Sequence, residues 1–172
     1  MYEKLKTISF KEILGYSIEG EEDAYKAYMT LAEKMEGLVS ERFKSLARDE
    51  KMHKKELLKL HEKEFGDQDY ILPEDEEDLP PHEGAMIKVN NVQNLIDALD
   101  KSMKAEYNAY RIYKYLADNK VKYATLFEYL AVMEKGHYET LKAEKSLYER
   151  PEERKKERRI RPFGEQTMGT QV

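Results

Sequence analysis

The sequence predicts an all-α protein in which two helical hairpins form a four-helix bundle over residues 1–150. Apolar residues recur three and four positions apart along four long segments, which is the period of an amphipathic helix. The pattern F-x-x-L-A-x-x-E-x-x-H also occurs twice, at Phe43–His53 and at Phe127–His137. Each copy follows a segment of the form E-x-x-A-x-x-x-Y-x-x-L-A, at Glu21–Ala32 and at Glu106–Ala117. The 172-residue chain therefore contains a duplicated helical hairpin.

The first hairpin is predicted at residues 9–66. A capping box, S-x-x-E, begins at Ser9 and marks the start of a helix of roughly 28 residues, about 40 Å long. Gly37 is expected to end this helix, because glycine readily adopts the left-handed conformation of a C-terminal cap. Ser40 is expected to cap the second helix, which Gly66 ends. The turn between the two helices is short, so they should pack as antiparallel neighbours.

A crossover is predicted at residues 67–90, where three prolines and a short acidic run replace the helical period. A loop of this length within one domain needs a structural reason, and a ferritin-like four-helix bundle provides it. In that topology one long connection runs from the second helix to the third. The second hairpin is predicted at residues 91–150, with Asn91 as its first cap and Pro151 as its end. The charged tail at residues 151–172 is predicted to be flexible.

Composition narrows the classes of function. The net charge of −5 gives no basic excess for binding nucleic acid, and the first ten residues and the rest of the chain contain no apolar stretch that could cross a bilayer. We therefore expect a soluble cytoplasmic protein that binds neither nucleic acid nor membranes. Cysteine is absent, which excludes a disulfide framework, a thiolate metal site and a catalytic thiol.

Six polar residues interrupt the apolar stripes of the four predicted helices, and these are the candidate metal ligands: Glu21, Glu50, His53, Glu106, Glu134 and His137. A buried carboxylate without a partner costs several kcal/mol or must take up a proton, and four converging carboxylates would repel one another. A pair of metal cations would compensate all four charges together. Glu-x-x-His also places both side chains on one face of a helix. One Glu from each of two helices and one Glu-x-x-His from each of the others is the ligand set of ferritin-like di-iron and di-manganese proteins.

Other residues leave alternatives open. Tyr28 and Tyr113 each follow a seam Glu by seven residues, so each either packs in the core or donates a hydrogen bond to a ligand carboxylate. A buried polar network without metal is the weaker alternative for the six seam residues. His61 and His82 are expected to be solvated and are not predicted ligands.

These motifs, in this order, resemble the rubrerythrin family of the ferritin-like superfamily over roughly residues 10–149. The resemblance implies two iron ions, with manganese as the alternative metal. It implies that Glu50 and Glu134 bridge the metals. It also implies that Glu21 with His53, and Glu106 with His137, are terminal ligands.

The resemblance implies an oxidoreductase that reduces hydrogen peroxide or dioxygen, and two departures qualify it. Typical rubrerythrins carry a rubredoxin domain with Cys-x-x-Cys pairs, whereas this sequence resembles the short members, so electrons would come from an external donor such as rubredoxin. Typical members also carry an extra Glu where this chain has Ala109, and that Glu is associated with peroxide reduction. An iron-binding protein, active as a ferroxidase or in sequestration, is therefore the alternative. A homodimer is expected, and the long crossover permits one in which hairpins are exchanged.

Overall fold

The computed structural model describes residues 1–75, 79–80 and 89–149. These residues form helices and no strand, which confirms the predicted all-α class. The elements are α1 (Tyr2–Thr7), α2 (Phe10–Lys34), α3 (Gly37–Phe65), α4 (Val92–Asn119), the short 3-10 helix η2 (Val121–Tyr123) and α5 (Ala124–Glu149). The predicted tail at residues 151–172 and His82 lie outside the described residues. None of the helices in this part of the chain combines the length and apolar character that crossing a bilayer requires.

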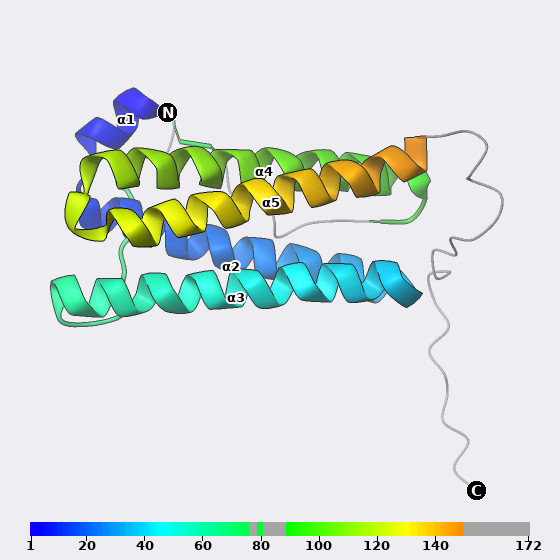
Figure 1. Cartoon of the computed structure of the whole chain (residues 1–172), viewed down its shortest axis with the longest axis horizontal. Helices are drawn as coiled ribbons and strands as arrows, with labels where there is room; N and C mark the ends of the chain where they lie inside the picture. Colours follow the sequence, from blue (N-terminus) through cyan, green and yellow to red (C-terminus); the bar gives the residue numbers. More distant parts are fainter. Residues whose placement is uncertain (76–78, 81–88, 150–172) are drawn as a thin grey trace, which may run out of the picture.

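The four long helices form a bundle of two hairpins (Figure 1). In the first, α2 and α3 are joined through Met35 and Glu36; in the second, α4 and α5 are joined through Lys120 and η2. Helix α3 ends at one end of the bundle and α4 begins at the other, so the connection between them spans the bundle's length (Figure 1). This arrangement is the ferritin-like topology that the sequence predicts.

Several predicted helix ends are confirmed. The side chain of Ser9 accepts a hydrogen bond from the backbone of Glu12, whose side chain accepts one from the backbone of Ser9, which completes the capping box. Gly66 caps α3 in the left-handed conformation, with φ of 88°. The side chain of Asn91 caps α4 by accepting a hydrogen bond from the backbone of Asn94.

The boundary between α2 and α3 differs from the prediction. Helix α3 begins at Gly37 rather than after Ser40, and its N-cap is Glu36. Gly37 does adopt a left-handed conformation, with φ of 57°, but as the first residue of α3. The hydroxyl of Ser40 donates to the carbonyl oxygen of Ala32 (2.7 Å) in the last turn of α2, so this serine joins the two helices instead of capping the start of α3.

Helix α1 was not expected from the sequence. Its six residues are too few to show a helical period, and it is held by tertiary contacts. Leu5 is buried in the bundle core, and the Lys4 ammonium forms an ion pair with Asp75 of the crossover (2.6 Å). The segment therefore links the N-terminus to the connection between the hairpins.

The crossover lies against α2 at two described positions. A β-carbon at Gly15 would overlap the carbonyl oxygen of Ile71, so only glycine permits this close approach. The hydroxyl of Tyr16 donates to the carbonyl oxygen of Pro80. A glycine inside a helix costs about 1 kcal/mol of stability relative to alanine. The close approach of the crossover explains why glycine is nevertheless present at position 15.

The apolar core is divided into two clusters. One includes Leu14 and Phe127 at the end of the bundle near α1, and the other includes Phe43 and Leu99 towards the opposite end. Polar side chains from all four long helices are buried between the two clusters. The fold therefore encloses a polar belt between two apolar clusters, and the candidate ligands lie in this belt.

Candidate metal centre

All six predicted ligands are buried in this polar belt. None of the six residues has more than 4 % of its surface exposed to solvent. Helix α2 contributes Glu21, α3 contributes Glu50 and His53, α4 contributes Glu106, and α5 contributes Glu134 and His137. The structure thus brings all six side chains into one region of a single chain, although their role as metal ligands stays a prediction.

The two Glu-x-x-His motifs form the tightest group. Glu50, His53, Glu134 and His137 each offer a ligand atom, and these four atoms lie within 4.8 Å of one another. The two imidazole rings are stacked, with centroids 5.5 Å apart. A ring nitrogen of each histidine lies 2.8 Å from the Glu of the opposite motif, Nδ1 of His53 from Glu134 and Nδ1 of His137 from Glu50.

The remaining two carboxylates are divided between the histidines. Nδ1 of His53 lies 3.6 Å from Glu21, and Nδ1 of His137 lies 3.6 Å from Glu106. The motif carboxylates, in contrast, each approach both histidines. Two central carboxylates and two outer Glu–His pairs are the arrangement that bridging and terminal ligands of a metal pair would require.

Two tyrosines connect the hairpins at the site. The hydroxyl of Tyr28 in α2 donates to Glu106 in α4, and the hydroxyl of Tyr113 in α4 donates to Glu21 in α2. Both tyrosines are fully buried. The sequence left open whether they pack or bind a carboxylate, and the structure shows that they do both. Each outer carboxylate is oriented by the hairpin to which it does not belong.

Without a metal, ionisation of the two outer carboxylates is unfavourable. Burial, together with the charge of Glu134, raises the pKa of Glu21 well above its usual value and that of Glu106 to about 8. Burial and the charge of Glu50 oppose ionisation of Glu134, but its contacts with Glu106 and the two histidines outweigh these effects and lower its pKa. Burial opposes charge on both histidines, yet the surrounding carboxylates raise the pKa of each imidazole above its ordinary value.

The chemistry of these donors fits a pair of metal ions. Glu50 Oε1, Glu134 Oε1 and His137 Nδ1 are buried, and their 2.8 Å contacts with the facing imidazole or carboxylate do not have the geometry of a hydrogen bond. Buried polar atoms without partners are rare in folded proteins and call for an explanation. Carboxylate oxygens with one imidazole per metal suit iron or manganese, and the chain has no thiolate to favour softer metals. Six donors converging on a buried site are therefore a suitable metal centre.

A cavity of about 70 Å³ reaches the carboxylate side of the site between α2 and α4. Glu21 and Glu106 are among its lining residues, and small side chains, including Ala24, Ala105 and Ala109, form much of its wall. A volume of this size exceeds the roughly 10–15 Å³ that a single water needs. The space beside the carboxylates, on the side away from the histidines, is therefore large enough for a small molecule.

The prediction that His61 is solvated was wrong. This histidine was expected to be solvated, but it is fully buried near the end of α3. Its Nδ1–H donates to the carbonyl oxygen of Asp67 (2.7 Å), and its ring lies 4.9 Å from that of Phe65. The chain turns back over the histidine after Gly66, a tertiary effect that helical periodicity does not reveal. His61 is not part of the candidate centre.

Fold and site together define a class: ferritin-like four-helix proteins with a buried carboxylate–histidine centre of the di-iron type. Comparison with known families is consistent with this class, because the rubrerythrin model matches residues 12–145, most of the chain. The protein belongs to the rubrerythrin family, which confirms the resemblance seen in its motifs.

A solved structure has a similar fold. A hypothetical protein from Pyrococcus furiosus is 34 % identical, with a TM-score of 0.75, and the match covers 85 % of this chain and 94 % of that one. A comparison with curated proteins gives no match.

Proposed function

We propose that this protein is a non-haem di-iron oxidoreductase that reduces hydrogen peroxide or dioxygen with electrons from an external donor such as rubredoxin, in the cytoplasm. The convergence of four buried carboxylates and two imidazoles, several of whose ligand atoms form close contacts but no hydrogen bond within the described residues, supports the proposal. Two ferrous ions bound there would supply the two electrons that convert one peroxide, with two protons, into two waters. Manganese is the alternative metal.

The residues of the chain have separate roles in this proposal. Glu50 and Glu134 would hold the two ions together, since each lies near both histidines. Tyr28 and Tyr113 would fix the outer carboxylates. Because burial raises the pKa of Glu106 to about 8, this carboxyl holds a proton near neutral pH that metal binding would release.

The size and the acidic lining of the cavity between α2 and α4 suit a small uncharged oxidant. Its lining residues include Glu21 and Glu106, so an anion approaching through it would meet like charge once the carboxylates ionise. Ala109 keeps this side open next to Glu106. Peroxide and dioxygen are both neutral and small enough for such a passage.

Metal analysis tests the centre itself. The purified protein should contain about two metal ions per chain, and the double variant Glu50→Ala/His53→Ala should lose them. Glu56→Ala/Lys59→Ala is a matched control, because these exposed residues have the same spacing on α3. Equal metal content in both variants would contradict the proposed centre.

Rapid mixing of the diferrous protein with each oxidant tests the reaction. Peroxide should oxidise the iron faster than dioxygen does if the protein is a peroxidase. Similar rates, or accumulation of many iron ions per chain, would instead favour the ferroxidase or sequestration alternative.

We also propose a homodimer. Tyr129 and Val132 of α5 and Met52 of α3 are 47 %, 71 % and 54 % exposed, which leaves apolar side chains for contact with a second copy. Both half-sites meet within one chain here, so such a dimer would not require exchange of hairpins. Light scattering of the purified protein, combined with crosslinking between hairpins, distinguishes a monomer, a dimer of whole bundles and an exchanged dimer.

A further inference from the structure

The two histidines of the centre differ on their outer sides. Both Nδ1 atoms face the carboxylates, so both Nε2 atoms point away from them. Nε2 of His137 lies 3.6 Å from Oδ2 of Asp49. Both Nε2 atoms are buried, and within the described residues neither has a hydrogen-bond partner. Among those residues, only His137 has a carboxylate within 4 Å of its Nε2.

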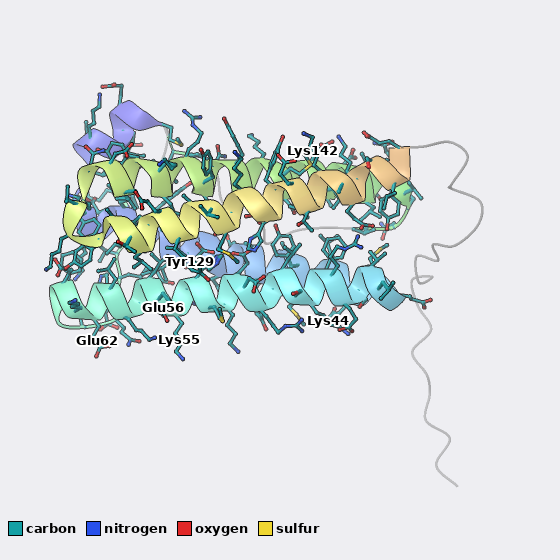
Figure 2. The ribbon with its side chains drawn as sticks, viewed as in Figure 1. Lys44, Lys55, Glu56, Glu62, Tyr129 and Lys142 are labelled. Carbon is teal, nitrogen blue, oxygen red and sulfur yellow. The ribbon has the colours of Figure 1, made fainter. Side chains whose placement is uncertain are left out.

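The duplication shows that this difference is a departure from symmetry. Asp49 directly precedes Glu50, and the residue in the same place 84 positions later is Met133, directly before Glu134. A thioether is only a weak hydrogen-bond acceptor and carries no charge. The ring of Tyr129 instead meets the His53 ring edge-on, with centroids 6.5 Å apart. Figure 2 shows Tyr129 between α5 and α3. The corresponding residue in the first repeat is Ser45.

A carboxylate behind a metal-binding histidine has known physical effects. When the outer ring N–H is donated to a carboxylate, the tautomer and the ring orientation are fixed, and the inner nitrogen becomes a stronger donor to the metal. The distance of 3.6 Å is slightly longer than a hydrogen bond. The side chain of Asp49 is 33 % exposed, so it has the freedom to close this gap.

We propose that Asp49 is a positioning residue that makes the two metal positions unequal. The position formed by His137 and Glu106 binds its ion more tightly than the position formed by His53 and Glu21. Metal therefore loads in two steps, although the ligand types on the two sides are identical. This inference rests on the proposed metal centre.

Titration of the metal-free protein with Co(II), in competition with a chelator, tests the inference. Co(II) gives visible absorption bands that report each binding step. The unchanged protein should bind two ions with separate affinities. Asp49→Asn should weaken the tighter step by about 10- to 100-fold and leave the weaker step unchanged. Circular dichroism of the metal-free variant checks that it is folded, which is expected for a partly exposed position.

Two further variants separate positioning from simple loss of charge. Met133→Asp places a carboxylate at the equivalent position of the other half, and it should strengthen the weaker step and bring the two affinities together. Glu56→Gln removes one negative charge from an exposed part of α3 and should leave the separation of the steps unchanged. If each carboxylate acts on one histidine alone, Asp49→Asn weakens the tighter step and Met133→Asp strengthens the weaker one. A general charge effect would not be confined to one step.

The inference is overturned if Asp49→Asn weakens both steps equally, as a general charge effect would, or changes neither. It is also overturned if the unchanged protein binds two ions with one affinity. Those results leave the metal centre itself intact, since two ions still bind. Failure of the unchanged protein to bind Co(II) would instead contradict both the centre and this inference.

Discussion

Replacement of Gly15 by alanine tests how closely the crossover approaches α2. A β-carbon there would overlap the carbonyl oxygen of Ile71 and lie 2.9 Å from its carbonyl carbon. Heavy atoms pack best at about 3.5–4.0 Å, and the carbonyl oxygen is the nearer of the two atoms, so the crossover would have to move by roughly 1 Å or more. Overpacking of this kind costs about 1–3 kcal/mol. The higher helix propensity of alanine offsets about 1 kcal/mol of this cost. We expect a net loss of about 1 kcal/mol in the free energy of unfolding.

Gly136→Ala is the matched control. Gly136 is also inside a helix, but a β-carbon there would meet no atom of the described residues within 4 Å. This variant should therefore gain up to about 1 kcal/mol from helix propensity alone. Urea denaturation of the metal-free proteins, followed by circular dichroism, measures both changes without a contribution from metal binding. Equal stabilisation by the two substitutions would refute the close contact between the crossover and α2.

Three further predictions concern the site. Tyr113→Phe removes the hydrogen bond to Glu21 and should lower stability by about 1.5–3 kcal/mol in urea denaturation, whereas Tyr107→Phe at the surface should change it by less than about 0.5 kcal/mol. The metal-free protein should become less stable as pH rises from about 4.5 to 8, because the native state keeps a proton on Glu106 that the unfolded chain loses. Glu106→Gln should flatten this dependence of stability on pH. An unchanged slope would contradict a raised pKa for that carboxyl. Ala109→Leu should fill the cavity and slow oxidation of the diferrous protein by peroxide at unchanged iron content, and an unaltered rate would show that the oxidant enters elsewhere.

The sequence predicts the bundle and the position of the six polar residues because both depend on periodicity. A Glu-x-x-His motif on an apolar stripe must point into a core, and the duplication shows that the two halves face each other. Local signals of the same kind placed the caps at Ser9, Gly66 and Asn91 correctly. These predictions need only the geometry of single helices.

Features that depend on how the helices cross were not predictable in this way. Helical periodicity places Tyr28 on the seam, but it does not show that the tyrosine bonds Glu106 rather than the glutamate of its own helix. The contact between Asp49 and His137 likewise joins two different helices. The burial of His61 follows from the return of the chain after α3. Each of these depends on tertiary contacts between segments that are separate in the sequence.

The crossed bonds of Tyr28 and Tyr113 have a consequence for how such a protein can arise. Tyr28 bonds Glu106, and their counterparts in the repeat, Tyr113 and Glu21, form the same bond in the opposite direction. Reciprocal contacts of this kind are those that two identical subunits make around a two-fold axis. A single hairpin that paired with its own copy would already form both bonds and a complete set of six donors. Fusion of two such hairpins into one chain adds a freedom that identical subunits lack, because each half can then change alone. Asp49 and Met133 mark a place where the two halves have diverged.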